Sequence, residues 1–129
     1  MPRITPILTL QLAAIFGFSA VALGAFAAHG LKGSLEPRML EAFKTGVLYQ
    51  MFHSLTLLAI VPLIWRKSDV RSLQLAIMGF VLGIVLFSGS LYLMAITGIR
   101  WLGAITPFGG VSFLLAWVAL FLSSRNALS

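Results

Sequence analysis

The chain has 129 residues, of which 60% are hydrophobic and 9% charged, and its mean hydropathy is +1.04. Soluble domains carry about 25% charged residues, so this composition excludes a water-soluble globule and indicates a bilayer as the solvent. Nine lysine and arginine residues outnumber three acids, for a net charge of +6. They lie in short segments between apolar stretches, which is typical of membrane-flanking residues and predicts no nucleic-acid partner. Because there is no cysteine, disulfides, thiolate metal sites and thiol chemistry are excluded.

Four uncharged intervals, 4–31, 45–65, 72–99 and 101–124, predict four membrane-spanning helices. Each is longer than the roughly 20 residues needed to cross about 30 Å of hydrocarbon. Helices are expected because lipid offers no hydrogen-bond partner to a backbone. The predicted fold is all-α, a single membrane domain over residues 1–129 that forms an antiparallel four-helix bundle. We expect the spans at about 7–28, 45–65, 72–97 and 101–122.

The first span resembles a secretory signal sequence at its end, Ala25-Phe26-Ala27, but its apolar run exceeds the 7–15 residues of such a segment, so a retained helix is expected. Small residues at four-residue spacing let helix backbones approach closely. The first and third spans carry such residues, and we predict that they pack within the chain rather than in a homodimer. They are Gly17, Ala20, Gly24, Ala28, Gly79 and Gly83.

The segment 32–44 is too polar to span a membrane, yet its apolar residues recur at helical spacing. This pattern predicts a short amphipathic helix in the membrane interface between the first and second spans. Ser34 is expected to cap it, and Glu41 to pair with Arg38 or Lys44. In the fourth span, Pro107 removes a backbone hydrogen bond and predicts a kink.

Basic residues decide the expected orientation. One side of the membrane would carry five basic residues: Arg3, Arg66, Lys67, Arg71 and Arg125. The other side would carry four: Lys32, Arg38, Lys44 and Arg100. Three of those four share their segment with two acids. We therefore expect both termini and the loop after the second span in the cytoplasm.

The spans contain no charged side chain, which argues against a proton-coupled exporter with a membrane-embedded carboxylate. It also argues against an oxygen-ligand ion cage and paired-carboxylate hydrolysis. The sequence has no Gly-x-Ser-x-Gly, phosphate-loop or His-Glu-x-x-His motif.

The polar candidates centre on His53, which lies about 10 Å into the second span. One interpretation is a neutral imidazole bonded across the bundle to Gln50, Tyr92, Ser88 or Ser90. The other is a ligand or head-group contact, a proton relay, or an axial ligand to haem or metal. His29 is expected to cap carbonyls at the end of the first span or to lie at the interface. Two histidines are too few for a closed zinc site, and we predict no metal or cofactor.

Four segments carry a resemblance to a known family: 21–29 (VALGAFAAH), 45–53 (TGVLYQMFH), 85–92 (VLFSGSLY) and 106–113 (TPFGGVSF). The chain resembles small bacterial four-span inner-membrane proteins classed as domain of unknown function 423, which have eukaryotic small transmembrane relatives. Ala27 stands where the family pattern leads us to expect glycine. The resemblance implies a four-helix protein of the bacterial inner membrane and no established activity.

Our candidate cluster consists of eight polar residues that lie in the family segments. They are His29, Tyr49, Gln50, His53, Ser88, Ser90, Tyr92 and Thr106. We interpret the chain as a non-enzymatic multi-pass protein, a structural or accessory bundle that binds a lipid or a protein partner. A homo-oligomer is compatible with this interpretation. The alternative is a small transporter or channel for a neutral or amphiphilic solute, with the cluster as its path and Pro107 as its hinge. A membrane enzyme comes third, because His53 supplies a general base without a second catalytic group.

Overall fold

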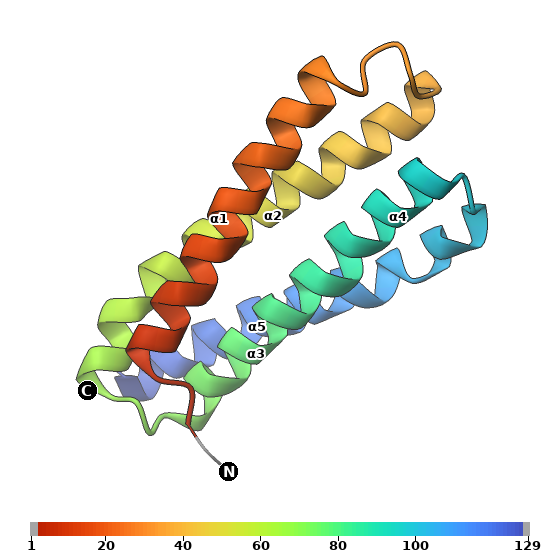
Figure 1. The fold of residues 1–129 in the computed structure, drawn as a ribbon. Coiled ribbons are helices and arrows are strands. Elements are labelled where there is room, and N and C mark those ends of the chain that lie inside the picture. Colours follow the sequence, from red (N-terminus) through yellow and green to blue (C-terminus); the bar gives the residue numbers. More distant parts are fainter. Residues whose placement is uncertain (1–2, 128–129) are drawn as a thin grey trace.

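The computed structural model describes residues 3–127, and every regular element in that part of the chain is helical (Figure 1). The α-helices are α1 (Pro6–His29), α2 (Pro37–Arg66), α3 (Arg71–Gly83), α4 (Gly89–Thr97) and α5 (Thr106–Ala127). A π-helical segment, η1 (Ile84–Ser88), joins α3 to α4, and a 3-10 segment, η2 (Arg100–Ala104), precedes α5. Together they form four apolar stretches long enough to cross a membrane. The predicted all-α, four-helix membrane bundle is confirmed.

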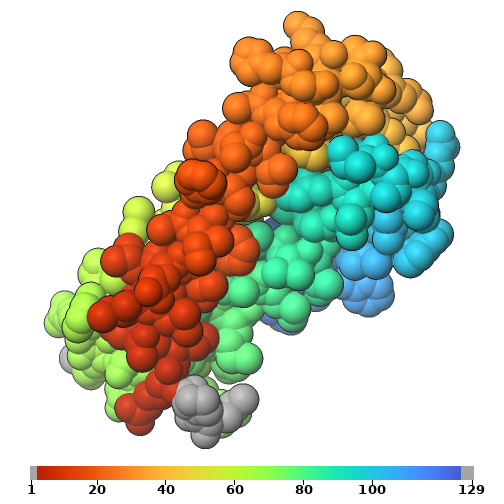
Figure 2. Space-filling model, viewed as in Figure 1, coloured from red at the N-terminus to blue at the C-terminus, as the bar shows by residue number. Residues whose placement is uncertain are grey.

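The bundle consists of two helical hairpins packed side by side. α1 packs along α2, and α3 packs along α5, while α2 contacts η1 and α4 across the middle. Both termini lie at the same end of the bundle as the loop between α2 and α3 (Figure 1). α1 forms a ridge on one face, where Phe18 is 79% exposed, as expected of a lipid-facing surface (Figure 2).

α1 begins with a capped turn and packs through a seven-residue repeat. The Thr5 side chain accepts a hydrogen bond from the Leu8 amide, and Pro6 takes the first helical position. The buried small residues are Ala13, Ala20 and Ala27, which is the spacing of antiparallel helices that coil around each other.

Two of the predicted small packing residues of α1 are therefore wrong. Ala28 is exposed, because a strict four-residue repeat drifts off one face of a helix with 3.6 residues per turn. Gly17 has open space where a Cβ would lie. Ala20 and Gly24 do pack on α2, with a Cβ on Gly24 placed 3.2 Å from Val47.

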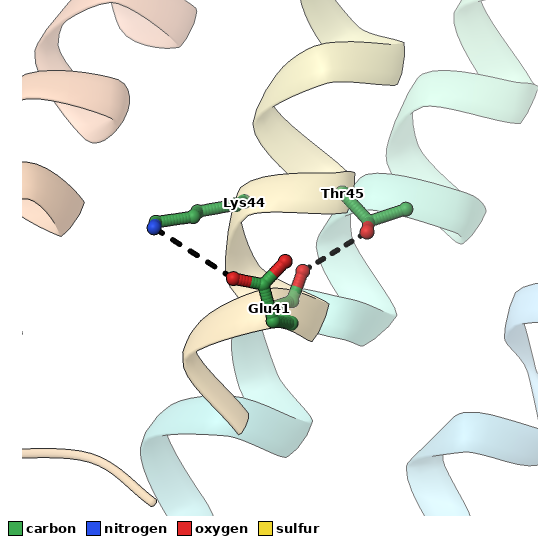
Figure 3. A network of polar contacts seen from close by, with 3 residues as sticks. All are labelled: Glu41, Lys44 and Thr45. Atoms are coloured by element: carbon green, nitrogen blue, oxygen red, sulfur yellow. Dashed lines mark hydrogen bonds and ion pairs between the residues drawn. The ribbon is translucent and has the colours of Figure 1, made fainter. Parts of the chain in front are cut away.

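The predicted separate interfacial helix is also wrong, because residues 37–44 form the first turns of α2. Pro37 starts the helix after Glu36, which makes no side-chain capping bond, and Ser34 does not cap it. The Thr45 hydroxyl donates to the Glu41 carbonyl (2.9 Å), and Lys44 pairs with the Glu41 carboxylate (3.7 Å; Figure 3). The Thr45 bond joins the amphipathic segment, which ends at Lys44, to the span that begins at Thr45, and the two form one continuous helix. At 1.5 Å per residue α2 is about 45 Å long and extends beyond the hydrocarbon.

The prediction of a kink at Pro107 is wrong too. α4 ends at Thr97. The next residue, Gly98, caps the helix with a φ of +74°, the left-handed conformation that favours glycine, and η2 follows. Pro107 is the second residue of α5, where a missing amide hydrogen leaves no helical bond unmade. The break in the fourth span thus precedes the proline. The proline inside an α-helix is Pro62 of α2, which the sequence analysis did not single out.

α3 and α5 approach closely because glycines line their contact. A Cβ on Gly79 would lie 2.8 Å from that of Ala116, and one on Gly83 would enter the Phe113 ring. The Ser112 hydroxyl donates to the Gly79 carbonyl at 2.8 Å across this interface. The prediction that Gly79 and Gly83 pack within the chain is confirmed.

The neighbouring glycines of α5 allow a matched test of this packing. A Cβ on Gly109 would lie 2.3 Å from the backbone nitrogen of Phe87, whereas one on Gly110 meets only a ring atom of Phe87 at 3.9 Å. We expect Gly109→Ala to destabilise the protein by about 1–3 kcal/mol through overpacking. Gly110→Ala should be neutral or slightly stabilising, since alanine is the better helix former. Thermal unfolding in detergent measures both, and equal melting temperatures for the two variants would contradict the close contact.

Candidate functional site

Gln50 is the centre of the largest polar network. Its side-chain amide nitrogen donates to the Phe16 carbonyl (2.9 Å) and to the Ser19 hydroxyl (2.7 Å), both on α1. Its amide oxygen accepts from the Tyr92 hydroxyl on α4 (2.7 Å). Since Gln50 is buried, an unpaired amide here would cost several kcal/mol. One side chain thus holds three helices together.

His53 forms a second network, with partners other than those predicted. Its Nδ1 lies 2.7 Å from the Tyr49 carbonyl, and its Nε2 lies 3.2 Å from the indole nitrogen of Trp117. A carbonyl only accepts and an indole N–H only donates, so these partners assign the proton to Nδ1 and make the imidazole neutral. The ring stacks on Phe113 with centroids 3.7 Å apart. The predicted bonds from His53 to Gln50, Tyr92, Ser88 or Ser90 are not formed.

Two serine hydroxyls of the third span, those of Ser88 and Ser90, form smaller sets of hydrogen bonds. Ser88 donates to the Gly46 carbonyl of α2 at 2.6 Å. Ser90 lies 2.6 Å from the Thr106 hydroxyl and donates to the Phe87 carbonyl at 3.0 Å. Each bond therefore fixes one helix against a neighbour or closes a local turn.

The structure separates the remaining two candidates from these networks. His29 is the exposed last residue of α1 and forms no hydrogen bond with the described residues. Tyr49 contributes its carbonyl to His53, while its ring packs on Phe87 with centroids 4.5 Å apart. Seven of the eight predicted residues thus form four separate groups of bonds rather than one cluster, and His29 belongs to none of them.

Sequence reasoning missed three polar partners. Ser19 and Trp117 complete the two main networks, and Gln74 bonds to both backbone groups of Ile4 (2.6 and 3.0 Å) and to the Ser68 carbonyl (3.1 Å). Trp117 carried a readable signal, because tryptophan prefers the membrane interface and this one lies well inside a span. An indole N–H at that depth in the membrane also needs a hydrogen-bond acceptor within the protein.

Four membrane-crossing helices tied by small polar networks define a polytopic helical membrane protein. The family model described as "Protein of unknown function (DUF423)" matches residues 23–110, and the chain belongs to this family. The resemblance predicted from the sequence is confirmed, and the chain is a multispan membrane protein of a family of unknown function.

Several relatives match over most of both chains. The UPF0382 membrane protein YwdK of Bacillus subtilis is 44% identical over 88% of this chain and 92% of its own length. A UPF0382 membrane protein of Haemophilus influenzae is 44% identical over 93% and 95%. The UPF0382 inner membrane protein YgdD of Escherichia coli is 39% identical over 89% and 87%. No solved structure matches the chain.

The two tyrosines test whether the Gln50 network stabilises the bundle. Tyr92→Phe removes the donor to Gln50 and should lower the free energy of unfolding by about 0.6–1.7 kcal/mol. Tyr49→Phe is the control, because the Tyr49 hydroxyl makes no hydrogen bond with the described residues. Titration from mild detergent into dodecyl sulfate measures both variants. A larger loss in Tyr49→Phe than in Tyr92→Phe would refute this assignment.

Proposed function

We propose that this protein is a non-enzymatic accessory bundle of the bacterial cytoplasmic membrane that acts by binding a lipid or a protein partner. The observation that carries this proposal is the pairing of the polar groups inside the spans. Gln50 and Tyr92 bond to each other, and Gln50 and Ser88 also donate to backbone carbonyls of facing helices. His53 bonds to Trp117 and to a carbonyl of its own helix, and Ser90 bonds to Thr106. Of the buried side-chain polar atoms in the described residues, Ser72 Oγ alone lacks a partner. Such bonds stabilise helix packing and leave few groups for a substrate.

The engagement of both ring nitrogens of His53 supports the non-enzymatic assignment. A general base needs a nitrogen free to take a proton from a substrate, and catalysis needs a second group beside it. In His53 one nitrogen donates to the Tyr49 carbonyl and the other accepts from Trp117. The imidazole is also covered by the Phe113 ring. The ring therefore acts as a linker between α2 and α5.

The alternative, a transporter for a neutral or amphiphilic solute, needs a polar path through the bundle. In the described residues no hydrogen bond joins the Gln50 side chain to the His53 ring, and aromatic rings surround the imidazole. This arrangement favours helix ties over a path.

Two variants of His53 test whether its ring ties α2 to α5. A glutamine can donate to the Tyr49 carbonyl and accept from Trp117, so we expect the variant to fold with a melting temperature close to that of the wild type. His53→Ala should lower the melting temperature, because it leaves the Trp117 indole without its acceptor.

The decisive measurement is uptake of glycerol and of ethidium by proteoliposomes. We expect the wild type, His53→Ala and protein-free vesicles to give the same rates. Uptake by the wild type that disappears in a folded His53→Ala variant would establish the transporter instead.

We also propose that both termini face the cytoplasm. Figure 1 places them at one end with the loop between α2 and α3. That end carries five basic residues against four at the other, which agrees with the positive-inside rule. The Escherichia coli relative is named an inner membrane protein, which supports the choice of membrane.

The cysteine-free sequence makes this orientation simple to measure. We expect Ser34→Cys, in the exposed loop after α1, to react with a membrane-impermeant maleimide in intact spheroplasts. Ser68→Cys, in the loop between α2 and α3, should react only after the membrane is permeabilised. The reverse pattern would invert the topology.

A further inference from the structure

A groove of about 490 Å³ lies between α2 and α5, and its walls are formed by residues 56–63 of α2 and 117–124 of α5. Small-molecule sites in proteins have volumes of about 300–1,000 Å³. Trp117 and Phe121 on its α5 wall are 44% and 71% exposed, so the groove opens toward lipid. Trp117 belongs both to the α5 wall of the groove and to the His53 network, and its bond to His53 lies at the inner end of the groove.

The length of the groove corresponds to one leaflet. From Thr56 to Leu63 the α2 wall of the groove rises about 10 Å at 1.5 Å per residue, and Arg66, at the end of the helix, lies about 5 Å further on. The hydrocarbon of a bilayer is about 30 Å thick, so the groove runs from near the bilayer centre to one surface. An acyl chain of that leaflet has the same direction and length.

The walls of the groove offer an occupant little polar contact. Its three hydroxyls bond to carbonyls of their own helices: Thr56 to Phe52 (2.9 Å), Ser123 to Leu120 (2.6 Å) and Ser124 to Phe121 (2.6 Å). The surfaces that remain are apolar, and they suit a hydrocarbon chain rather than a polar solute.

Two arginines stand at the surface end of the groove. Arg66 is the last residue of α2, and Arg125 directly follows Ser124 of the α5 wall. Both are exposed, and neither forms an ion pair with the described residues. Figure 1 shows the last turns of the two helices close together, as the shared groove requires. Of the other charged residues at this end, Arg3 and Arg71 line a separate pocket together with the acid Asp69.

We propose that this groove binds one acyl chain of an anionic phospholipid, whose phosphate is held by Arg66 and Arg125. Guanidinium groups bind phosphate oxygens through paired charge-assisted hydrogen bonds. The inference rests on the proposed lipid-binding function and names the ligand class. The leaflet is the one at the end of the bundle that holds both termini.

Trp117 reports directly on the occupant. In a Trp65→Phe/Trp101→Phe protein it is the one remaining tryptophan, and bromine atoms in the middle of an acyl chain quench an indole on contact. The protein is reconstituted in phosphatidylcholine vesicles that contain a small fraction of dibrominated phosphatidylglycerol or the same fraction of dibrominated phosphatidylcholine. We expect preferential quenching by phosphatidylglycerol, on the order of five-fold for each arginine engaged.

Charge variants separate a site from general surface attraction. Arg66→Gln/Arg125→Gln should bring the ratio of the two lipids close to one, with the Trp117 emission maximum unchanged as a check of folding. Arg71→Gln is the control, because it removes a charge at the same end of the bundle but away from the groove. It should keep most of the preference.

Three results would overturn the inference: equal quenching by both lipids in the parent protein, an equal loss in Arg71→Gln and in the double variant, or no quenching by either lipid. The last would show that something other than lipid, such as a second copy of the chain, covers the groove. Each of these results leaves the non-enzymatic bundle standing, whereas solute uptake that depends on His53 refutes the proposed function and is measured independently.

Discussion

The hydrocarbon of the membrane offers no hydrogen-bond partner, and the rest of this structure depends on that constraint. A buried amide or imidazole in a span must bond within the protein. Gln50 does so by contacting α1 and α4, and His53 does so through Trp117 of α5. The second span therefore contacts each of the other three spans through a polar side chain. Ser88 adds a second bond from the third span, to the Gly46 carbonyl. These bonds determine how the helices can rotate and slide relative to one another.

Between those ties the helices associate by close packing, because lipid tails are as apolar as the side chains they contact. α1 meets α2 through alanines at seven-residue spacing, and α3 meets α5 through Gly79 and Gly83. α2 meets α5 where the His53 ring stacks on Phe113 and accepts the bond from Trp117. The groove lies beyond that bond, toward the end of the bundle that holds both termini.

The four spans could be predicted from the sequence because uncharged intervals longer than 20 residues are unambiguous in a 129-residue chain. The partners of His53 could not, since they depend on how far each helix rotates about its axis. The π-helical segment at Ile84–Ser88 changes that rotation within the third span. It brings Tyr92 to Gln50 rather than to His53. The start of α5 at Thr106 could not be predicted either, because a proline fits both a kink and a first helical turn.

Trp117 connects the structural and the proposed binding roles of the bundle. Its indole nitrogen satisfies His53, while its ring forms the inner end of the groove between α2 and α5. A hydrocarbon chain in the groove would pack against the ring and fill the space between α2 and α5. A ligand that binds the folded state stabilises it by mass action. A lipid in the groove would therefore add contacts between the two hairpins, and an anionic head group would find the two arginines at the same end of both helices.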